Sequence, residues 1–222
     1  MYRISRDQWR SKARHDLKSS APQFSRLLDD IDEFVAHVAF EVSGQKVAGS
    51  KDNKYIVFLL VSFIRTHMTA TDLARSGDLI DSAIIVRKQM ETLSRLAELT
   101  SSVDSSTLIR RTPNIGQLRS SLKRLYGAYS EISHSSDPAH ARLLGPAKFG
   151  PDLPLFPKYS EHSLVSIGHI AMTIVELFVW VSENLEDIGF TYDRGWGDRW
   201  WAVTAPTLMD AIGPDSPDPY GV

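Results

Sequence analysis

The sequence contains no cysteine, which excludes a disulfide framework and any metal site built on thiolates. It also lacks an excess of either charge, because 25 Lys and Arg against 27 Asp and Glu give a formal net charge of -2. A general electrostatic attraction to nucleic acid or to an anionic membrane is therefore not expected. These absences exclude small secreted domains, zinc ribbons and iron–sulfur proteins, and they favour a cytoplasmic location.

Sequence motifs for nucleotide and metal chemistry are missing as well. The chain has no GxxxxGKS or GxGxxG loop, no HExxH pair and no Cys–His zinc spacing. His162, His169, Glu176 and Glu183 recur every seven residues, but seven residues of helix rise about 10.5 Å, which one ion cannot bridge. We expect these four residues to form a polar stripe, with no metal and no cofactor.

Long hydrophobic runs are scarce. Residues 56–64 (IVFLLVSFI) are far fewer than the roughly 20 that span a bilayer. Residues 164–181 are long enough, but they include His169 and Glu176, which are costly inside a membrane. Both runs are predicted to be core helices, and no membrane partner is expected.

Apolar residues recur at steps of three and four in several stretches, which is typical of helices with one buried face. No run alternates with the period of a β-strand, and no internal repeat is visible. The sequence therefore predicts an all-α fold, a bundle of about five helices. The expected helices cover residues 20–43, 54–75, 79–99, 115–134 and 160–188.

The remaining segments define the domain organisation. Residues 1–19 carry repeated Arg and Lys and are predicted to be a basic N-terminal arm, and residues 20–188 form the bundle domain. Within it, residues 135–158 are rich in proline and glycine and should form a long loop. Residues 189–222 are expected to be an irregular tail whose tryptophans pack on this subunit or on a protein partner. Those tryptophans are Trp196, Trp200 and Trp201.

Two polar groupings are candidate sites. Arg87 and Glu91 lie four residues apart and are neighbours on one helix, as either an edge ion pair or part of a functional site. Tyr126, Ser130 and His134 are expected to share a face of the next helix. Ser130 and His134 fit a nucleophile and its base, or a hydroxyl beside a helix C-terminal cation.

A run of basic residues precedes and enters the helix of Tyr126. No acidic residue lies between positions 110 and 124, so this patch fits either contacts with RNA phosphates or a solvated helix face. The residues are Arg110, Arg111, Arg119, Lys123 and Arg124.

The segments AIIVRKQMETLSRLAEL and YGAYSEISHSS resemble those of bacterial helical proteins of the DUF5677 type, which are themselves similar to the HEPN superfamily. The resemblance covers residues 55–180. It implies a homodimer and one polar cluster between the two helices. The cluster would contain Arg87, Glu91, Tyr126, Ser130, His134 and Ser136.

HEPN-like proteins are often metal-independent ribonucleases of toxin–antitoxin and phage-defence systems. By this resemblance His134 would act as general acid and base on RNA, and Arg87 would stabilise the charged phosphate. Glu91 would orient one of these two side chains. The family pattern places an arginine four to six residues before the histidine, whereas the nearest upstream arginine here is Arg124. Two alternatives remain: a non-catalytic protein-interaction module, and a pocket that senses a small anion at Arg87.

Overall fold

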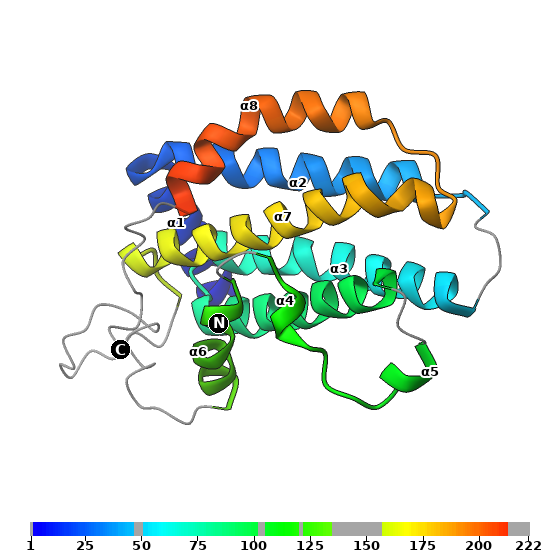
Figure 1. Ribbon diagram of the computed structural model, residues 1–222. Coiled ribbons are helices and arrows are strands. Elements are labelled where there is room, and N and C mark those ends of the chain that lie inside the picture. Colours follow the sequence, from blue (N-terminus) through cyan, green and yellow to red (C-terminus); the bar gives the residue numbers. More distant parts are fainter. Residues whose placement is uncertain (1, 47–50, 102–104, 120–121, 135–156, 213–222) are drawn as a thin grey trace.

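The computed structural model describes residues 2–46, 51–101, 105–119, 122–134 and 157–212 (Figure 1). Within these ranges all regular structure is helical, so the predicted all-α class is confirmed. The elements are α1 (Tyr2–Ser20), α2 (Pro22–Val42), α3 (Lys51–Arg75), α4 (Leu79–Thr100), α5 (Ser105–Leu108), the 3₁₀ turn η1 (Ile115–Gln117), α6 (Leu122–His134), α7 (Glu161–Ile188) and α8 (Arg194–Ile212).

Helix α7 lies at the centre of the bundle. It contacts α2, α3, α4, α6 and α8, and in Figure 1 it runs between the α2–α8 pair and the α3–α4 pair. Ile167, Ile170, Ile174, Leu177 and Val181 follow one another at steps of three and four, and all are buried. The other long helices therefore assemble around this one apolar helix.

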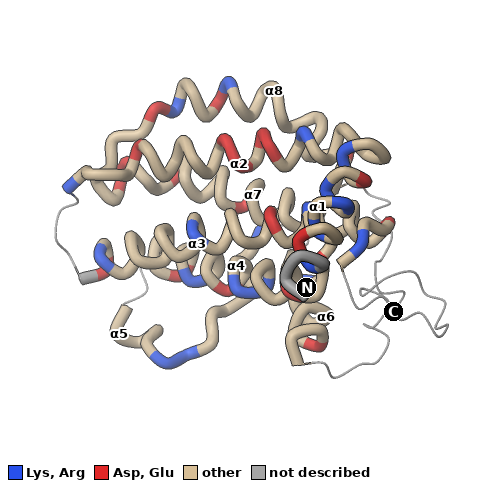
Figure 2. Tube along the Cα trace, turned by 180° about the vertical axis from the view of Figure 1, so that it is seen from behind, with Lys and Arg blue, Asp and Glu red and all other residues tan. Residues whose placement is uncertain are grey.

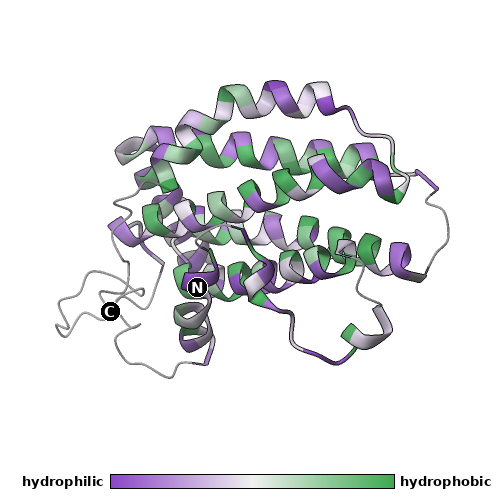
Figure 3. Ribbon diagram, viewed as in Figure 1, coloured by the Kyte–Doolittle hydropathy of each residue, from purple (hydrophilic) through white to green (hydrophobic). Residues whose placement is uncertain are grey.

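Two helices are long and apolar enough to cross a membrane, judged by length and composition alone. They are residues Asp52–Arg75 of α3 and all of α7, and Figure 3 shows apolar positions recurring along both. Packing accounts for α7, because 72% of its most apolar window is buried inside the bundle. Only 39% of the corresponding window of α3 is buried, so α3 keeps an exposed apolar face.

The predicted basic arm is wrong for the described part of residues 1–19, which form helix α1. Ala13 and Leu17 of this helix are buried in the bundle. Two of its arginines pair with acids around the α3–α4 turn. Arg10 Nε lies 2.8 Å from Asp78 Oδ2, and Arg14 Nη2 lies 2.7 Å from Asp72 Oδ1. These two arginines thus help to attach α1 to the rest of the bundle.

The prediction of an irregular tail is also wrong for residues 194–212, which form α8 despite Pro206 inside it. Trp200 is buried, stacks on Phe34 at 4.5 Å between centroids, and donates its Nε1–H to the Asp30 carbonyl at 2.9 Å. Trp196 stacks on His37 at 3.6 Å. The tryptophans therefore pack on their own subunit. Residues 213–222 lie outside the described chain.

The helix expected at 115–134 is divided. Asn114 Oδ1 accepts a hydrogen bond from the Gly116 N–H at 3.0 Å, which caps the short turn η1. Leu118 then has an extended backbone, and α6 begins only at Leu122. The loop expected at 135–158 lies outside the described residues apart from its last two.

The α3–α4 turn depends on Gly77. Its φ of 76° lies in the left-handed region, which costs a residue with a Cβ about 1–2 kcal/mol. A Cβ here would also collide with the backbone of Lys158, which lies shortly before α7. The same glycine thus lets the chain reverse between α3 and α4 and leaves room for the segment that leads into α7.

Gly77→Ala should destabilise the protein by about 2–4 kcal/mol, because it combines left-handed strain with a collision against backbone atoms. The matched control is Gly44→Ala, since Gly44 has a φ of 75° but an open surrounding. Gly44→Ala should cost only about 1 kcal/mol. Urea unfolding of both variants measures the difference, and equal losses would contradict the close approach of Lys158.

Candidate functional site

The polar cluster predicted between the two helices forms, with a changed membership. Arg87 and Glu91 lie on consecutive turns of α4, and Tyr126 lies on α6, which packs across α4. The Tyr126 hydroxyl donates to Glu91 Oε1 at 2.7 Å and accepts from Arg87 Nη2 at 3.4 Å. Arg87 Nη2 also lies 3.3 Å from Glu91 Oε1. Arg87, Glu91 and Tyr126 thus converge as the sequence predicted.

The fourth member is Ser133. Arg87 Nη1 donates to Ser133 Oγ at 2.6 Å, and Ser133 Oγ donates in turn to the Ser130 carbonyl at 2.9 Å. The guanidinium also lies over the Tyr126 ring, with 5.4 Å from its carbon to the ring centroid, a distance suited to a cation–π contact. We call Arg87, Glu91, Tyr126 and Ser133 the Arg87 cluster.

The expected convergence of Ser130 and His134 on Arg87 is wrong. Ser130 contributes only its backbone carbonyl, and His134 is exposed at the end of α6. Helix geometry gives the reason why Ser133, and not His134, meets Arg87, because each residue turns the helix by about 100°. Ser133 therefore lies about 20° from Tyr126 around the axis, whereas His134 lies about 80° away. Ser136 lies outside the described residues.

Charge states in the Arg87 cluster are fixed by its own members. Partial burial is the main cause that raises the pKa of Tyr126, and Glu91 raises it further. The hydrogen bond to Tyr126 is the main cause that raises the pKa of Arg87, and the charge of Glu91 is a smaller one. Arg87 is therefore a permanent cation and Tyr126 a neutral donor at neutral pH. Such a group can hold two helices together, and its carboxylate, Glu91, is engaged by both Tyr126 and Arg87.

A second contact between polar side chains fixes α6 on α7. The Tyr129 hydroxyl and His169 Nδ1 share a hydrogen bond, and both residues are buried. Burial lowers the pKa of His169 to about 4. His169 is therefore neutral at neutral pH and serves the packing of α6.

The five basic residues do not form one free patch. Arg119 makes two parallel hydrogen bonds to Glu183 on α7, each 2.6 Å long. The Arg111 carbonyl accepts a hydrogen bond from Arg95 of α4. Arg110 and Arg111 are exposed directly after α5, where Figure 2 shows a blue segment, and Lys123 and Arg124 are exposed on α6.

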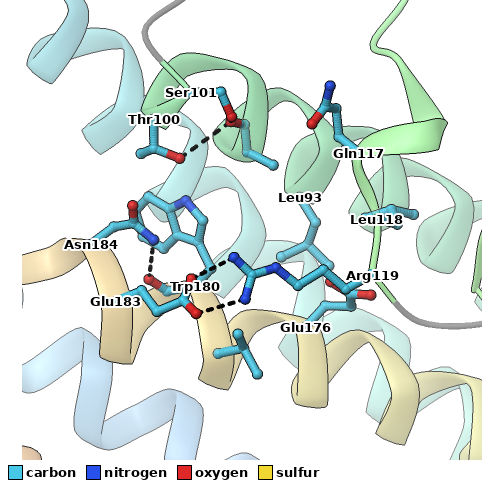
Figure 4. A pocket seen from close by; sticks show the side chains of 12 residues that line it. Leu93, Thr100, Ser101, Gln117, Leu118, Arg119, Glu176, Trp180, Glu183 and Asn184 are labelled. Carbon is cyan, nitrogen blue, oxygen red and sulfur yellow. Dashed lines mark hydrogen bonds and ion pairs between the residues drawn. The ribbon is translucent and has the colours of Figure 1, made fainter.

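The Arg119–Glu183 pair lies at a cavity of about 200 Å³ between α4, the η1 segment and α7 (Figure 4). In that view the guanidinium of Arg119 reaches over the cavity to the carboxylate of Glu183. Leu93 and Trp180 supply apolar walls, and Glu176 is a further acid. Arg87, Glu91 and Tyr126 do not line it, so this cavity is separate from the Arg87 cluster.

Within the described part of the chain, no three His, Asp or Glu side chains are grouped so that they could hold a metal ion. Comparison with known proteins adds no assignment: no protein-family model, curated protein or solved structure matches the chain. The case for a function therefore depends on the geometry of the described residues.

Ser133→Ala should lower the free energy of unfolding by about 1 kcal/mol, because Arg87 loses a hydrogen-bond acceptor. Ser130→Ala is the matched control, since both changes remove a serine hydroxyl from α6 and only Ser133 meets Arg87. The control should stay within about 0.5 kcal/mol of the wild type. Chemical denaturation of the two variants decides this, and a larger loss from Ser130→Ala would refute the assignment of Ser133.

Stability should fall as the pH is lowered from about 6.5 to about 4. The unfolded chain binds a proton at His169 in this window and the folded chain does not, so each pH unit costs up to about 1.4 kcal/mol. Buried His67 adds in the same direction, because burial lowers its pKa too.

The His169 contribution is isolated by comparing two variants over this pH range. His169→Gln should flatten the dependence of unfolding free energy on pH, whereas His134→Gln, at an exposed position, should keep the wild-type slope. An unchanged slope in His169→Gln would show that His169 is not held neutral by the fold.

Proposed function

We propose that this protein is a non-catalytic interaction module, in which the Arg87 cluster is structural. The observation that carries this proposal is the engagement of both terminal nitrogens of Arg87, while its Nε, which has no hydrogen-bond partner in the described structure, is buried away from solvent. Its two terminal nitrogens contact Glu91, Tyr126 and Ser133, all from its own chain. A cation with these three partners holds α6 against α4, and a phosphate would have to compete with them for its terminal nitrogens.

The same geometry bears on the small-anion alternative. An anion at Arg87 would compete with Glu91, whose carboxylate lies 3.3 Å from the guanidinium. Both side chains are partly exposed, at 23% for Arg87 and 31% for Glu91, so the pair is reachable but already neutralised. An interaction module needs no ligand at this position, and we therefore favour it.

Ribonuclease activity is the second candidate, and one observation favours it. His134 is exposed, and Lys123 and Arg124 are exposed on the same helix. An RNA strand lying along α6 would meet these two cations and the imidazole together. In that case His134 would act without Arg87. The exposed His134 lies about 80° around α6 from Tyr126, the residue of this helix that contacts Arg87.

Incubation of the purified protein with total RNA separates the two candidates. We expect no cleavage by the wild type, and the same melting temperature for His134→Ala, since this side chain is exposed. Cleavage by the wild type that is lost in His134→Ala, with Ser130→Ala as an active control, would overturn the proposal in favour of the ribonuclease.

A further inference from the structure

Helix α3 presents an apolar seam to solvent. Its exposed positions include Lys54, Phe58, Val61, Arg65, Met68 and Asp72, which follow one another at alternating steps of four and three. This spacing has the period of 3.5 residues found where one helix packs along another. In the described structure no helix covers this seam, and it is 65% exposed at Phe58, 42% at Val61 and 40% at Met68.

The opposite faces of α3 are already used. Ile56, Leu60 and Phe63 are buried in the core, and α4 packs along the helix. Tyr55, Val57 and Ile64 are half-buried beside the seam and widen its apolar surface. Three large apolar side chains in one line on the outside of a bundle are unusual unless something binds there.

The order of side chains along the seam indicates what binds. Two copies of α3 can pack antiparallel with residue 63 at the two-fold axis. A seam residue that lies a given number of residues before position 63 then faces the residue that lies the same number after position 63 in the second copy. Phe58 then lies against Met68 of the second copy, and Val61 lies against the long stem of Arg65. At both ends Lys54 lies against Asp72 of the second copy, an attractive charge pair that Asp72 would share with Arg14 of its own chain, which lies 2.7 Å from its Oδ1.

We infer that this protein forms a homodimer through the exposed seam of α3, with its two α3 helices antiparallel. The inference deepens the proposed function, on which it rests, by naming a second copy of this chain as a partner. A partner helix of the same sequence satisfies both the apolar centre and the opposite charges at the ends. A bilayer would satisfy only the centre and would have to accommodate Lys54, Arg65 and Asp72.

Sedimentation equilibrium of the purified full chain tests the dimer. The wild type should be dimeric at micromolar concentration, and Phe58→Glu should raise the dissociation constant at least about a hundredfold. Val203→Glu is the matched control, because Val203 is 79% exposed on α8, away from the seam. It should remain dimeric, and both variants should keep the helix content of the wild type.

The charge pair gives a test of the antiparallel register. Lys54→Glu and Asp72→Lys should each weaken the dimer, and the double variant should restore it at low salt, because the swapped charges again meet across the axis. Repair within one chain is excluded, since 18 residues of helix separate the two positions by about 27 Å. Asp72→Lys also breaks the pair between Asp72 and Arg14 that attaches α1, so Arg14→Gln is the control: it loses the same pair within the chain and should keep the wild-type dimer.

Three results would overturn the inference: a monomeric wild type, a dimer insensitive to Phe58→Glu, or a double variant as weak as the single ones. Flotation of the wild type with lipid vesicles, lost in Phe58→Glu, would also overturn it and assign the seam to a membrane. None of these results bears on RNA cleavage, so failure of the dimer and failure of the non-catalytic proposal are distinguishable.

Discussion

Burial of α7 is the constraint on which the rest of the structure depends. Its apolar residues lie on nearly all sides, so the helix is stable only where other helices surround it. Helices α2 and α8 pack on one side and α3 and α4 on the other. The aromatic rings of α8 complete this enclosure, with Trp200 between Phe34 and Phe178 at centroid distances of 4.5 and 5.9 Å. A segment rich in tryptophan, glycine and proline is therefore part of the core.

Apolar packing is non-directional, whereas the placement of the short helix α6 depends on directional contacts. The Arg87 cluster ties α6 to α4, and the Tyr129–His169 hydrogen bond ties it to α7. These contacts involve residue types that are common in catalysis, namely an arginine, tyrosines and a histidine. These side chains hold α6 in place: the terminal nitrogens of Arg87 are bonded within the cluster, and the low pKa of His169 keeps it neutral. This use of these side chains is the basis of the proposal that the protein is an interaction module.

The long amphipathic helices were predictable from the sequence, because their apolar residues repeat over many turns. The roles of the two ends were not. Residues 1–19 have the composition of a solvated arm, and only the positions of Asp72 and Asp78 in the fold show that their arginines are paired. At the site, the spacing of four between Arg87 and Glu91 was informative. The pairing of Ser130 with His134 in the sequence does not indicate Ser133. The signal for Ser133 is its spacing: it lies seven residues after Tyr126, which is closer to two full helical turns than the eight residues to His134.

The exposed seam of α3 and the Arg87 cluster together fit the proposal of a helical bundle that offers a surface for contacts. The claim that the cluster is structural is tested most directly by a double-mutant cycle on unfolding free energy, with Arg87→Met, Ser133→Ala and the double variant. Residues in one hydrogen-bonded network should show a coupling of about 1 kcal/mol, so the double variant should lose less stability than the two single losses added together. Strictly additive losses would contradict the account, because they would show that Arg87 and Ser133 do not act on each other in the folded protein.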